Sequence, residues 1–303
     1  MATGRARAAW GRTRRPSESG SPWSSWPSAP AAGCSRRRPA RRAKPRPRLR
    51  ASSRSASDLV DIVADVLAFD IETYADFAGL PASTRAYLTR RDEARGIGPR
   101  DRRAVGNKAA LLPGVAQVIA IGLWGALDGA ERLSLSLVPD LASERAEAFG
   151  EGGVRLLRFR QEADLLEAFW QRCEAALRSG RRLVSFHGRS FDGPILALRS
   201  AVLGVRPRVQ LVGHRSATRP HLDLAELLSF FGARRERYGL DYWCAAFQIE
   251  SPKQDLDGAA VGAAFEGGRH RDIARYALED ARATGELFLR LADTLLPLAE
   301  ESA

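Results

Sequence analysis

Two acidic residues at the end of an apolar run, Asp70 and Glu72, could do metal chemistry. They belong to the octapeptide Val-Leu-Ala-Phe-Asp-Ile-Glu-Thr at residues 66–73. Side chains of a strand alternate between its faces, so Asp70 and Glu72 point the same way while Ile71 points back into the core. Two carboxylates on one face of a buried strand repel each other and are costly to desolvate. A divalent cation with oxygen ligands offsets both costs, whereas a strand end at which both acids meet solvent is the simpler alternative.

Asp192 is a third acid that follows a predicted strand. The strand covers residues 183–186, and a glycine-containing turn leads from it to Asp192. Pro194 follows, and proline favours the first turn of a helix. Aspartate is also a favoured helix N-cap. On this stretch alone, capping is the better interpretation of Asp192.

A tyrosine and an aspartate, Tyr276 and Asp280, share one face of the predicted final helix because they are four residues apart. Ile273, Ala277 and Ala281 lie on or near the same stripe, which indicates that this face packs inward. Aspartate in the middle of a helix has no capping role and is a poor helix former. A functional role for Asp280 is therefore favoured over a solvated surface carboxylate.

The elements that must position these acids follow from the apolar pattern. We expect strands over residues 65–71, 115–124, 133–138 and 183–186. We expect helices over residues 82–90, 162–177, 194–203, 223–231, 240–248, 257–265 and 271–296, with an otherwise irregular insertion over 73–113. Three adjacent strands, followed by alternating strands and helices, are typical of an α/β fold with a mixed sheet flanked by helices.

Charge divides the 303-residue chain into two parts. Its net charge is +11, but residues 1–57 contain fifteen arginines or lysines and one acid, Glu18. The rest of the chain is therefore close to neutral, and its charge does not by itself indicate nucleic-acid binding. We predict a disordered tail rich in Arg, Ser and Pro over residues 1–59 and one catalytic domain over residues 60–303.

The basic tail has three interpretations. Its arginines suit a nonspecific nucleic-acid arm, and its composition also suits an organellar transit peptide. We favour the third, an upstream extension from a misassigned start codon, or else a dispensable arm. The three cysteines are scattered without a C-x-x-C pair, so neither a disulfide framework nor a zinc site is predicted. We expect a bacterial cytoplasmic protein without membrane association; import into an organelle is the minor alternative.

Together these motifs resemble those of the DEDD superfamily of 3′–5′ exonucleases. The ordered signature is D-x-E on a first strand, Phe-Asp after a middle strand and Tyr-x-x-x-Asp on a late helix. The tyrosine is similar to that of the DEDDy subgroup. More narrowly, the chain resembles stand-alone bacterial exonucleases similar to the proofreading domain of B-family DNA polymerases. Stretches that carry this closer resemblance are 186–192, 221–224, 240–245, 253–258 and 276–284.

The resemblance implies a ribonuclease H-like fold in which the four acids converge. It implies that Asp70, Glu72 and Asp280 hold one metal and that Asp70 and Asp192 hold a second. All-carboxylate ligation favours two divalent cations, Mg²⁺ or Mn²⁺. Tyr276 would orient or help to deprotonate the attacking water.

Residues around these acids are predicted to contact the substrate: Thr73, His187, Arg189, Phe191 and Lys253. Many relatives carry Asn where this chain has His187, and both side chains can donate a hydrogen bond. Lys253 could equally be an exposed loop lysine. We interpret a fifth acid, Asp223, as a helix cap.

The predicted function is hydrolysis of phosphodiester bonds at the 3′ end of single-stranded nucleic acid by a two-metal mechanism. DNA is preferred, because the closer resemblance is to a DNA proofreading domain, and proofreading would act in trans with a polymerase or repair partner. The alternatives are an RNA-trimming exoribonuclease and an inactive nucleic-acid-binding module of the same fold. Nothing in the sequence indicates the oligomeric state.

Overall fold

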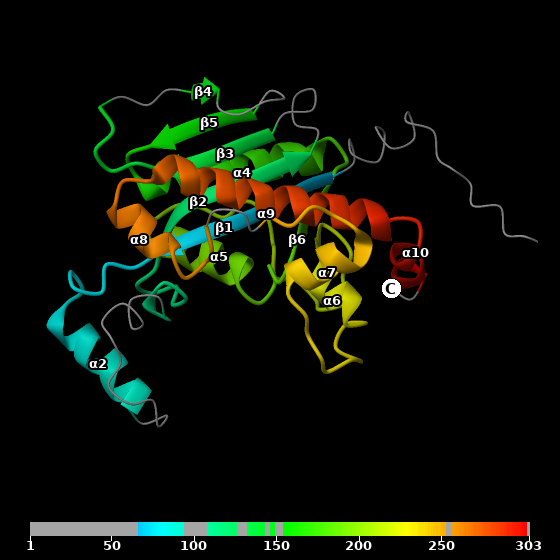
Figure 1. Cartoon of the computed structure of the whole chain (residues 1–303), viewed down its shortest axis with the longest axis horizontal. Helices are drawn as coiled ribbons and strands as arrows, with labels where there is room; N and C mark the ends of the chain where they lie inside the picture. The colour runs from blue at the N-terminus through cyan, green and yellow to red at the C-terminus, as the bar shows by residue number, and fades with distance from the viewer. Residues whose placement is uncertain are drawn as a thin grey trace, which may run out of the picture. The chain divides into compact units, whose positions relative to one another are not determined.

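Apolar runs in the sequence form the strands of one seven-stranded sheet in the computed structural model (Figure 1). The structure describes residues 66–93, 108–125, 132–142, 146–148, 154–252 and 256–301. The strand order is β4-β5-β3-β2-β1-β6-β7. Their bounds are β1 Val66–Tyr74, β2 Gln117–Gly125, β3 Arg132–Leu137, β4 Ala146–Ala148, β5 Val154–Phe159, β6 Arg182–Ser185 and β7 His221–Asp223.

The sheet is mixed, and β1 is one of its interior strands. β1 pairs antiparallel with β2 and parallel with β6. On one side β3 continues the sheet antiparallel to β2, and on the other β7 is parallel to β6. The predicted α/β class, a mixed sheet flanked by helices, is confirmed.

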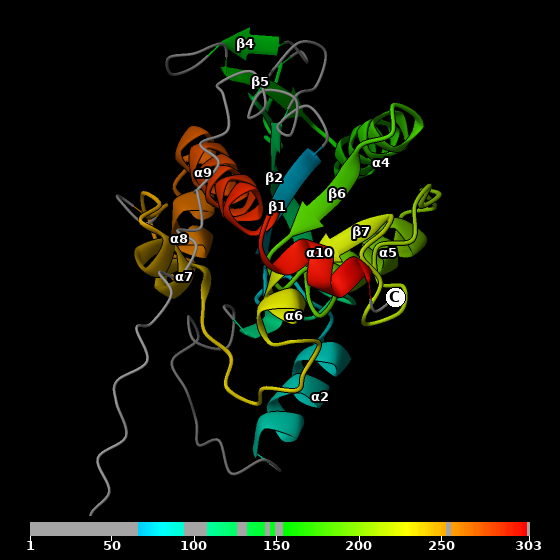
Figure 2. The same ribbon diagram turned by 90° about the vertical axis from the view of Figure 1, so that its right-hand side faces the viewer.

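Helices cover both faces of the sheet. Figure 2 shows α9 on one face, and α4 and α5 on the other. These three are α4 Glu162–Arg178, α5 Asp192–Val202 and α9 His270–Leu291. The remaining helices are α2 Ala82–Glu93, α6 Leu224–Leu228, α7 Leu240–Phe247, α8 Val261–Glu266 and α10 Leu295–Glu300.

The two faces of β1 belong to different parts of the core. Leu67, Phe69 and Ile71 are buried in one hydrophobic cluster with residues of α4 and α5. Val66 and Ala68 are buried in a second cluster that includes residues of α9. Alternation along the strand therefore directs the next two side chains of the second face, at positions 70 and 72, towards α9.

Two glycines allow α9 to lie against the sheet at very short range. A Cβ atom added at Gly122 in β2 would lie 2.1 Å from the carbonyl oxygen of Ala277 in α9. A Cβ atom added at Gly285 in α9 would lie 2.1 Å from the ring of Trp124 in β2. Any larger residue would push the helix away from the sheet. Gly122 is also the direct neighbour of Asp70 in the β1–β2 pairing.

Most predicted elements are present, but the helices predicted over 223–231 and 257–265 are shorter, as α6 Leu224–Leu228 and α8 Val261–Glu266. The sequence pattern did not predict β4, β5 or β7, which have three to six residues each. The helix predicted over 271–296 is in fact two helices, because α9 ends at Leu291 and α10 begins at Leu295. The hydroxyl of Thr294 donates to the carbonyl of Arg290, a local bond that competes with helix continuation. The predicted tail, residues 1–59, lies outside the described residues.

Within the part of the chain that the structure describes, no helix combines the length and hydropathy that a membrane span requires.

The substitution Gly122→Ala tests the close approach of α9. We expect it to lower the free energy of unfolding by about 2 kcal/mol or more, because the new methyl group overlaps backbone atoms that cannot move aside without shifting the helix. Urea denaturation followed by circular dichroism measures this loss. Gly114→Ala is the matched control, since nothing lies within 4 Å of a Cβ atom there. Equal stability of the two variants would contradict the proposed contact.

Candidate metal centre and active site

The final helix brings an aspartate to the two acids of the first strand. Asp70 and Glu72 are half-buried on β1, and Asp280 is half-buried on α9. One ligand oxygen from each of the three carboxylates can be chosen so that all lie within 4.8 Å of one another. The three acids predicted to share a metal are therefore neighbours in the structure.

Asp192 lies beside this trio at the start of α5. Its side chain is only 3% exposed. Its carboxylate does not cap the helix, since Phe191 is the N-cap residue and Asp192 is the first residue of the helix. The backbone N–H groups of Asp192 itself and of Ile71 in β1 lower the pKa of this carboxyl group, so the carboxylate lies close to both. The start of α5 therefore places Asp192 beside the strand that carries the other acids.

The carboxyl groups of Asp70, Glu72 and Asp192 are desolvated and lie close to other acids. Burial, followed by Asp280, Asp192 and Glu72, raises the pKa of Asp70 well above its usual value. Burial and the same two aspartates raise the pKa of Glu72. Burial is also the largest cause that raises the pKa of Asp192, to about 7. Desolvated like charges of this kind favour either proton uptake or a bound cation.

The donor set fits a hard divalent cation. Among the described residues, the converging ligands are carboxylate oxygens without a histidine or cysteine. Mg²⁺ and Mn²⁺ prefer such oxygens, whereas zinc prefers nitrogen and sulfur ligands. A cation would also offset the mutual repulsion that raises the pKa values of the carboxyl groups.

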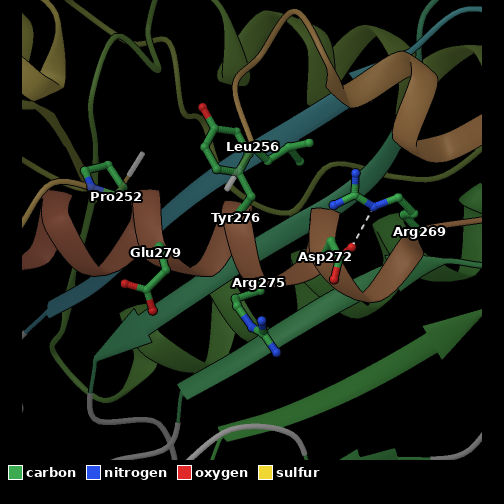
Figure 3. A pocket seen from close by; sticks show the side chains of 7 residues that line it. All are labelled: Pro252, Leu256, Arg269, Asp272, Arg275, Tyr276 and Glu279. Carbon is green, nitrogen blue, oxygen red and sulfur yellow. Dashed lines mark hydrogen bonds and ion pairs between the residues drawn. The ribbon is translucent and has the colours of Figure 1, made fainter. Parts of the chain in front are cut away.

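Tyr276 lies one turn before Asp280 and faces the same group of acids. Its side chain is buried, and burial, followed by Asp280, Glu72 and Asp70, raises the pKa of its hydroxyl above the usual value. The hydroxyl is therefore neutral and can donate a hydrogen bond. Figure 3 shows the ring beside Leu256 and on a different side of α9 from Glu279. It lines a cavity of about 400 Å³ with these residues and with Pro252, Arg269, Asp272 and Arg275.

A larger cavity of about 1090 Å³ adjoins the acids at the end of β1. Glu72 and Thr73 line it from β1, and Phe191 lines it from the turn before α5. The β1–β2 pairing shifts register between Glu72 and Thr73, an irregularity common beside active sites. The hydroxyl of Thr73 donates to the carbonyl of Ala110 at 2.7 Å. Two residues predicted to contact the substrate, Thr73 and Phe191, therefore border a space next to the carboxylates.

The turn between β6 and α5 is organised by Asp223. The Asp223 carboxylate accepts from the backbone N–H groups of His187 and Arg189, each at 3.0 Å. It also accepts from the backbone N–H groups of Ala225 and Glu226, so the predicted cap of α6 is confirmed. Asp223 thus joins the start of α6 to the turn that delivers Asp192.

His187 satisfies a backbone requirement of this turn. Its φ angle is 64°, in the left-handed region where asparagine and histidine are enriched among residues other than glycine. This requirement suits the histidine found at this position. Contact between the His187 side chain and substrate stays a prediction.

Arg189 has a structural role in place of the predicted substrate contact. Its side chain is buried, and its guanidinium donates to the carbonyls of Arg215, Ala217 and His221. A guanidinium used in this way holds the chain around β7 and is not directed at a phosphate. Sequence spacing placed Arg189 beside the site but did not show which way its side chain turns. The other predicted cation, Lys253, lies outside the described residues.

Sequence reasoning missed the part of the site that comes from α8. Gly258, Ala259, Gly262 and Ala263 line the larger cavity opposite β1. The feature that could have indicated this cavity wall is the run of small residues around α8, because small side chains leave room for a ligand. Small residues alone do not distinguish a cavity from close helix packing, so the sequence pattern did not predict a cavity here.

Comparison with known proteins identifies the family. Residues 150–301, half of the chain, match the model of a family described as predicted 3′–5′ exonucleases related to the exonuclease domain of PolB. The chain belongs to this family. The matched region contains Asp192, Tyr276 and Asp280, whereas Asp70 and Glu72 precede it.

Among solved structures, the chain is similar to the family B DNA polymerase from the hyperthermophilic archaeon Pyrobaculum calidifontis. Sequence identity is 20% and the TM-score is 0.47. The similarity covers 78% of this chain and 26% of the polymerase, so the chain matches about a quarter of that protein's length.

The raised pKa values predict that a metal stabilises the protein in a pH-dependent way. Without metal, the unfolded state ionises its aspartates near the usual value of 3.8, while folded Asp192 ionises near 7. Stability of the metal-free protein is therefore expected to fall as the pH rises through this interval. Mn²⁺ binds the ionised carboxylates, so it should raise the melting temperature more at pH 8 than at pH 5.

A thermal-shift titration with MnCl₂ at both pH values measures the effect, with Asp280→Asn as the comparison variant. We expect Asp280→Asn to lose most of the shift at pH 8. An equal Mn²⁺ shift in the variant and the unsubstituted protein would contradict metal binding by the three carboxylates.

Proposed function

We propose that this protein is a metal-dependent 3′–5′ exonuclease that hydrolyses phosphodiester bonds at the 3′ end of single-stranded nucleic acid, with DNA preferred. The observation that carries the proposal is the convergence of Asp70, Glu72 and Asp280, with ligand atoms within 4.8 Å of one another. Membership of a family of predicted exonucleases gives the same reaction class. We assign the activity to a domain formed by residues 60–303.

In the proposed site, Asp70, Glu72 and Asp280 hold one divalent cation, and Asp70 and Asp192 hold a second. Bound Mg²⁺ or Mn²⁺ would supply an activated water and stabilise negative charge on the departing 3′ oxygen. The position of the Asp192 carboxylate near the backbone of Ile71 supports the second site, because it places this acid next to β1.

Tyr276 acts as a hydrogen-bond donor that orients the attacking water. Its burial among carboxylates keeps its hydroxyl protonated, which disfavours a role as the base that removes the water's proton. Its position one turn from Asp280 directs it at the same reaction centre. Of the two roles predicted from the sequence, orientation of the water is therefore the better supported.

The cavity beside Glu72 is the proposed pocket for the terminal nucleotide. Its volume of about 1090 Å³ exceeds the upper end of typical small-molecule sites, so it has room for a nucleotide. Phe191 offers an aromatic face at the wall of this cavity, and nucleobases stack well on such faces. Thr73 adjoins the proposed ligand Glu72 and would contact the sugar-phosphate backbone.

Two alternatives share this site. An RNA-trimming exoribonuclease would use the same acids, and the DNA preference rests on the relation of the family to the PolB domain. An inactive nucleic-acid-binding module is disfavoured because Asp70, Glu72, Asp192 and Asp280 are all present, together with Tyr276. The cytoplasmic location and a polymerase or repair partner acting in trans stay predictions from the sequence.

Removal of one metal ligand tests the proposal directly. We expect Asp70→Ala and Asp280→Asn to reduce Mg²⁺-dependent degradation to the background without metal, because each removes a carboxylate from the proposed first cation. The assay uses matched DNA and RNA oligonucleotides labelled at either end, with and without Mg²⁺. A 5′ label should give a ladder that shortens from the 3′ end, and DNA should be degraded faster than RNA.

The control is the circular dichroism spectrum of each variant, which should match that of the unsubstituted protein. Full activity in either variant would reject the assigned site. Faster degradation of RNA would select the exoribonuclease alternative. Binding without hydrolysis in either metal would select the inactive module.

Tyr276→Phe separates orientation of the water from metal binding. It removes only the hydroxyl, so we expect the hydrolysis rate at saturating substrate to fall by about 10²-fold or more while the Mn²⁺-induced thermal shift is retained. Comparison of rate and thermal shift in the same preparation measures both. Unchanged hydrolysis would remove Tyr276 from the proposed mechanism.

A further inference from the structure

A group of aromatic and basic side chains, most of them exposed, lies on the connection between α6 and α7 and in the first turn of α7. The tyrosine rings of Tyr238 and Tyr242 are stacked, with centroids 4.2 Å apart and an interplanar angle of 18°. Tyr242 is 51% exposed and Phe230 is 54% exposed. Arg234 and Arg235 lie exposed between them in sequence. These five residues are called the aromatic–arginine loop below.

The core does not bury the rings of Tyr242 and Phe230. Tyr238 is half-buried, and both Tyr238 and Tyr242 contact the ring of Trp243 edge-on. Trp243 packs against a buried hydrophobic cluster, so the stacked tyrosine pair is anchored to α7. Tyr242 and Phe230 are nevertheless more than half exposed, as aromatic side chains of a binding surface are.

The backbone of the loop is strained at the same place. Phe230 and Phe231 have φ angles of 51° and 52°, a left-handed conformation that is rare for bulky residues. Such strain costs free energy, and it is most often found at functional sites. Here it accompanies the exposure of the Phe230 ring.

The charge of the loop is positive. Residues 234–237 read Arg-Arg-Glu-Arg. Arg237 is paired with Glu226, which also pairs with Arg215, so the acid at the base of the loop is already matched by two arginines. Exposed arginines beside exposed aromatic rings suit an anionic polymer with flat bases.

The loop is placed next to the proposed site. α7 contacts α9, and Cys244 of α7 is buried in the same cluster as Ala281, the neighbour of Asp280. The cavity proposed for the terminal nucleotide adjoins Glu72 and α8 instead. Glu72 thus borders that cavity, while Asp280 lies on the part of α9 that packs near α7. Figures 1 and 2 show the connection between α6 and α7 extending away from the sheet below α9.

We propose that the aromatic–arginine loop binds single-stranded nucleic acid on the 5′ side of the scissile bond, with bases stacked on Tyr242 and Phe230 and phosphates near Arg234 and Arg235. This inference rests on the proposed function, because it takes its direction from the 3′ end held in the cavity. Stacking on aromatic rings does not depend on base identity, so the surface serves strands of any sequence.

The test compares a long strand, which reaches the loop, with a trinucleotide, which does not. The variants are Tyr238→Ala/Tyr242→Ala and Arg234→Gln/Arg235→Gln in the full chain. Binding of oligo(dT) of about 15 nucleotides is measured by fluorescence anisotropy with Asp70→Ala in the background to prevent hydrolysis. We expect the tyrosine variant to weaken binding by about tenfold, and the arginine variant to weaken it and to lower its dependence on salt.

Degradation of the trinucleotide by the same loop variants, with Asp70 intact, should be unchanged. Tyr242→Phe keeps the ring and should bind as the unsubstituted protein does. Arg178→Gln, at an exposed arginine of α4, is the matched charge control and should have no effect.

The possible outcomes distinguish a role of the loop in binding the strand from an effect of the substitutions on the active site. Equal binding of the long strand by all variants would overturn the proposal, and would leave a protein partner as the occupant of this surface. An equal loss on the long strand and the trinucleotide would also overturn it, because the substitutions would then act on the site itself. If the unsubstituted protein binds the long strand in a loop-dependent way but hydrolyses nothing, the loop is supported and the exonuclease assignment fails.

Discussion

The contact between α9 and the sheet is the constraint on which the rest of the site depends. A helix normally packs on a sheet through side chains, but here Gly122 of β2 receives the backbone of Ala277 directly. Because Gly122 is paired with Asp70, the closest approach of the helix falls beside the acidic end of β1. Asp280, a short side chain less than one turn further along, can therefore reach the carboxylates of the strand.

The close approach of α9 to β1 brings several carboxylates together, which costs electrostatic free energy. Burial and neighbouring carboxylates raise the pKa values of Asp70, Glu72 and Asp192, whereas the carboxylate of nearby Asp223 accepts from four backbone N–H groups. These two kinds of carboxylate differ in what stabilises them. Hydrogen bonds from the backbone stabilise Asp223 as part of the fold, while the metal-site acids retain oxygens that can accept a cation.

The sequence alone predicted the central strand and helix and the acids that they carry, because each has a strong local pattern. The buried strand β1 and the amphipathic helix α9 are set by periodicity, and Tyr276 and Asp280 share a face by spacing alone. Short strands such as β7 have too few residues for a pattern. The direction of the Arg189 side chain could not be predicted, since it depends on three carbonyls supplied by chain that follows much later. Likewise, the meaning of Gly122 depends on a helix some 150 residues away.

The proposed first cation takes its ligands from the first described strand and the last long helix. A chain still under synthesis has Asp70 and Glu72 long before it has Asp280, and β1 cannot gain its third ligand until α9 has emerged and packed on Gly122. The proposed ligand set is therefore completed only when the last long helix folds onto the sheet.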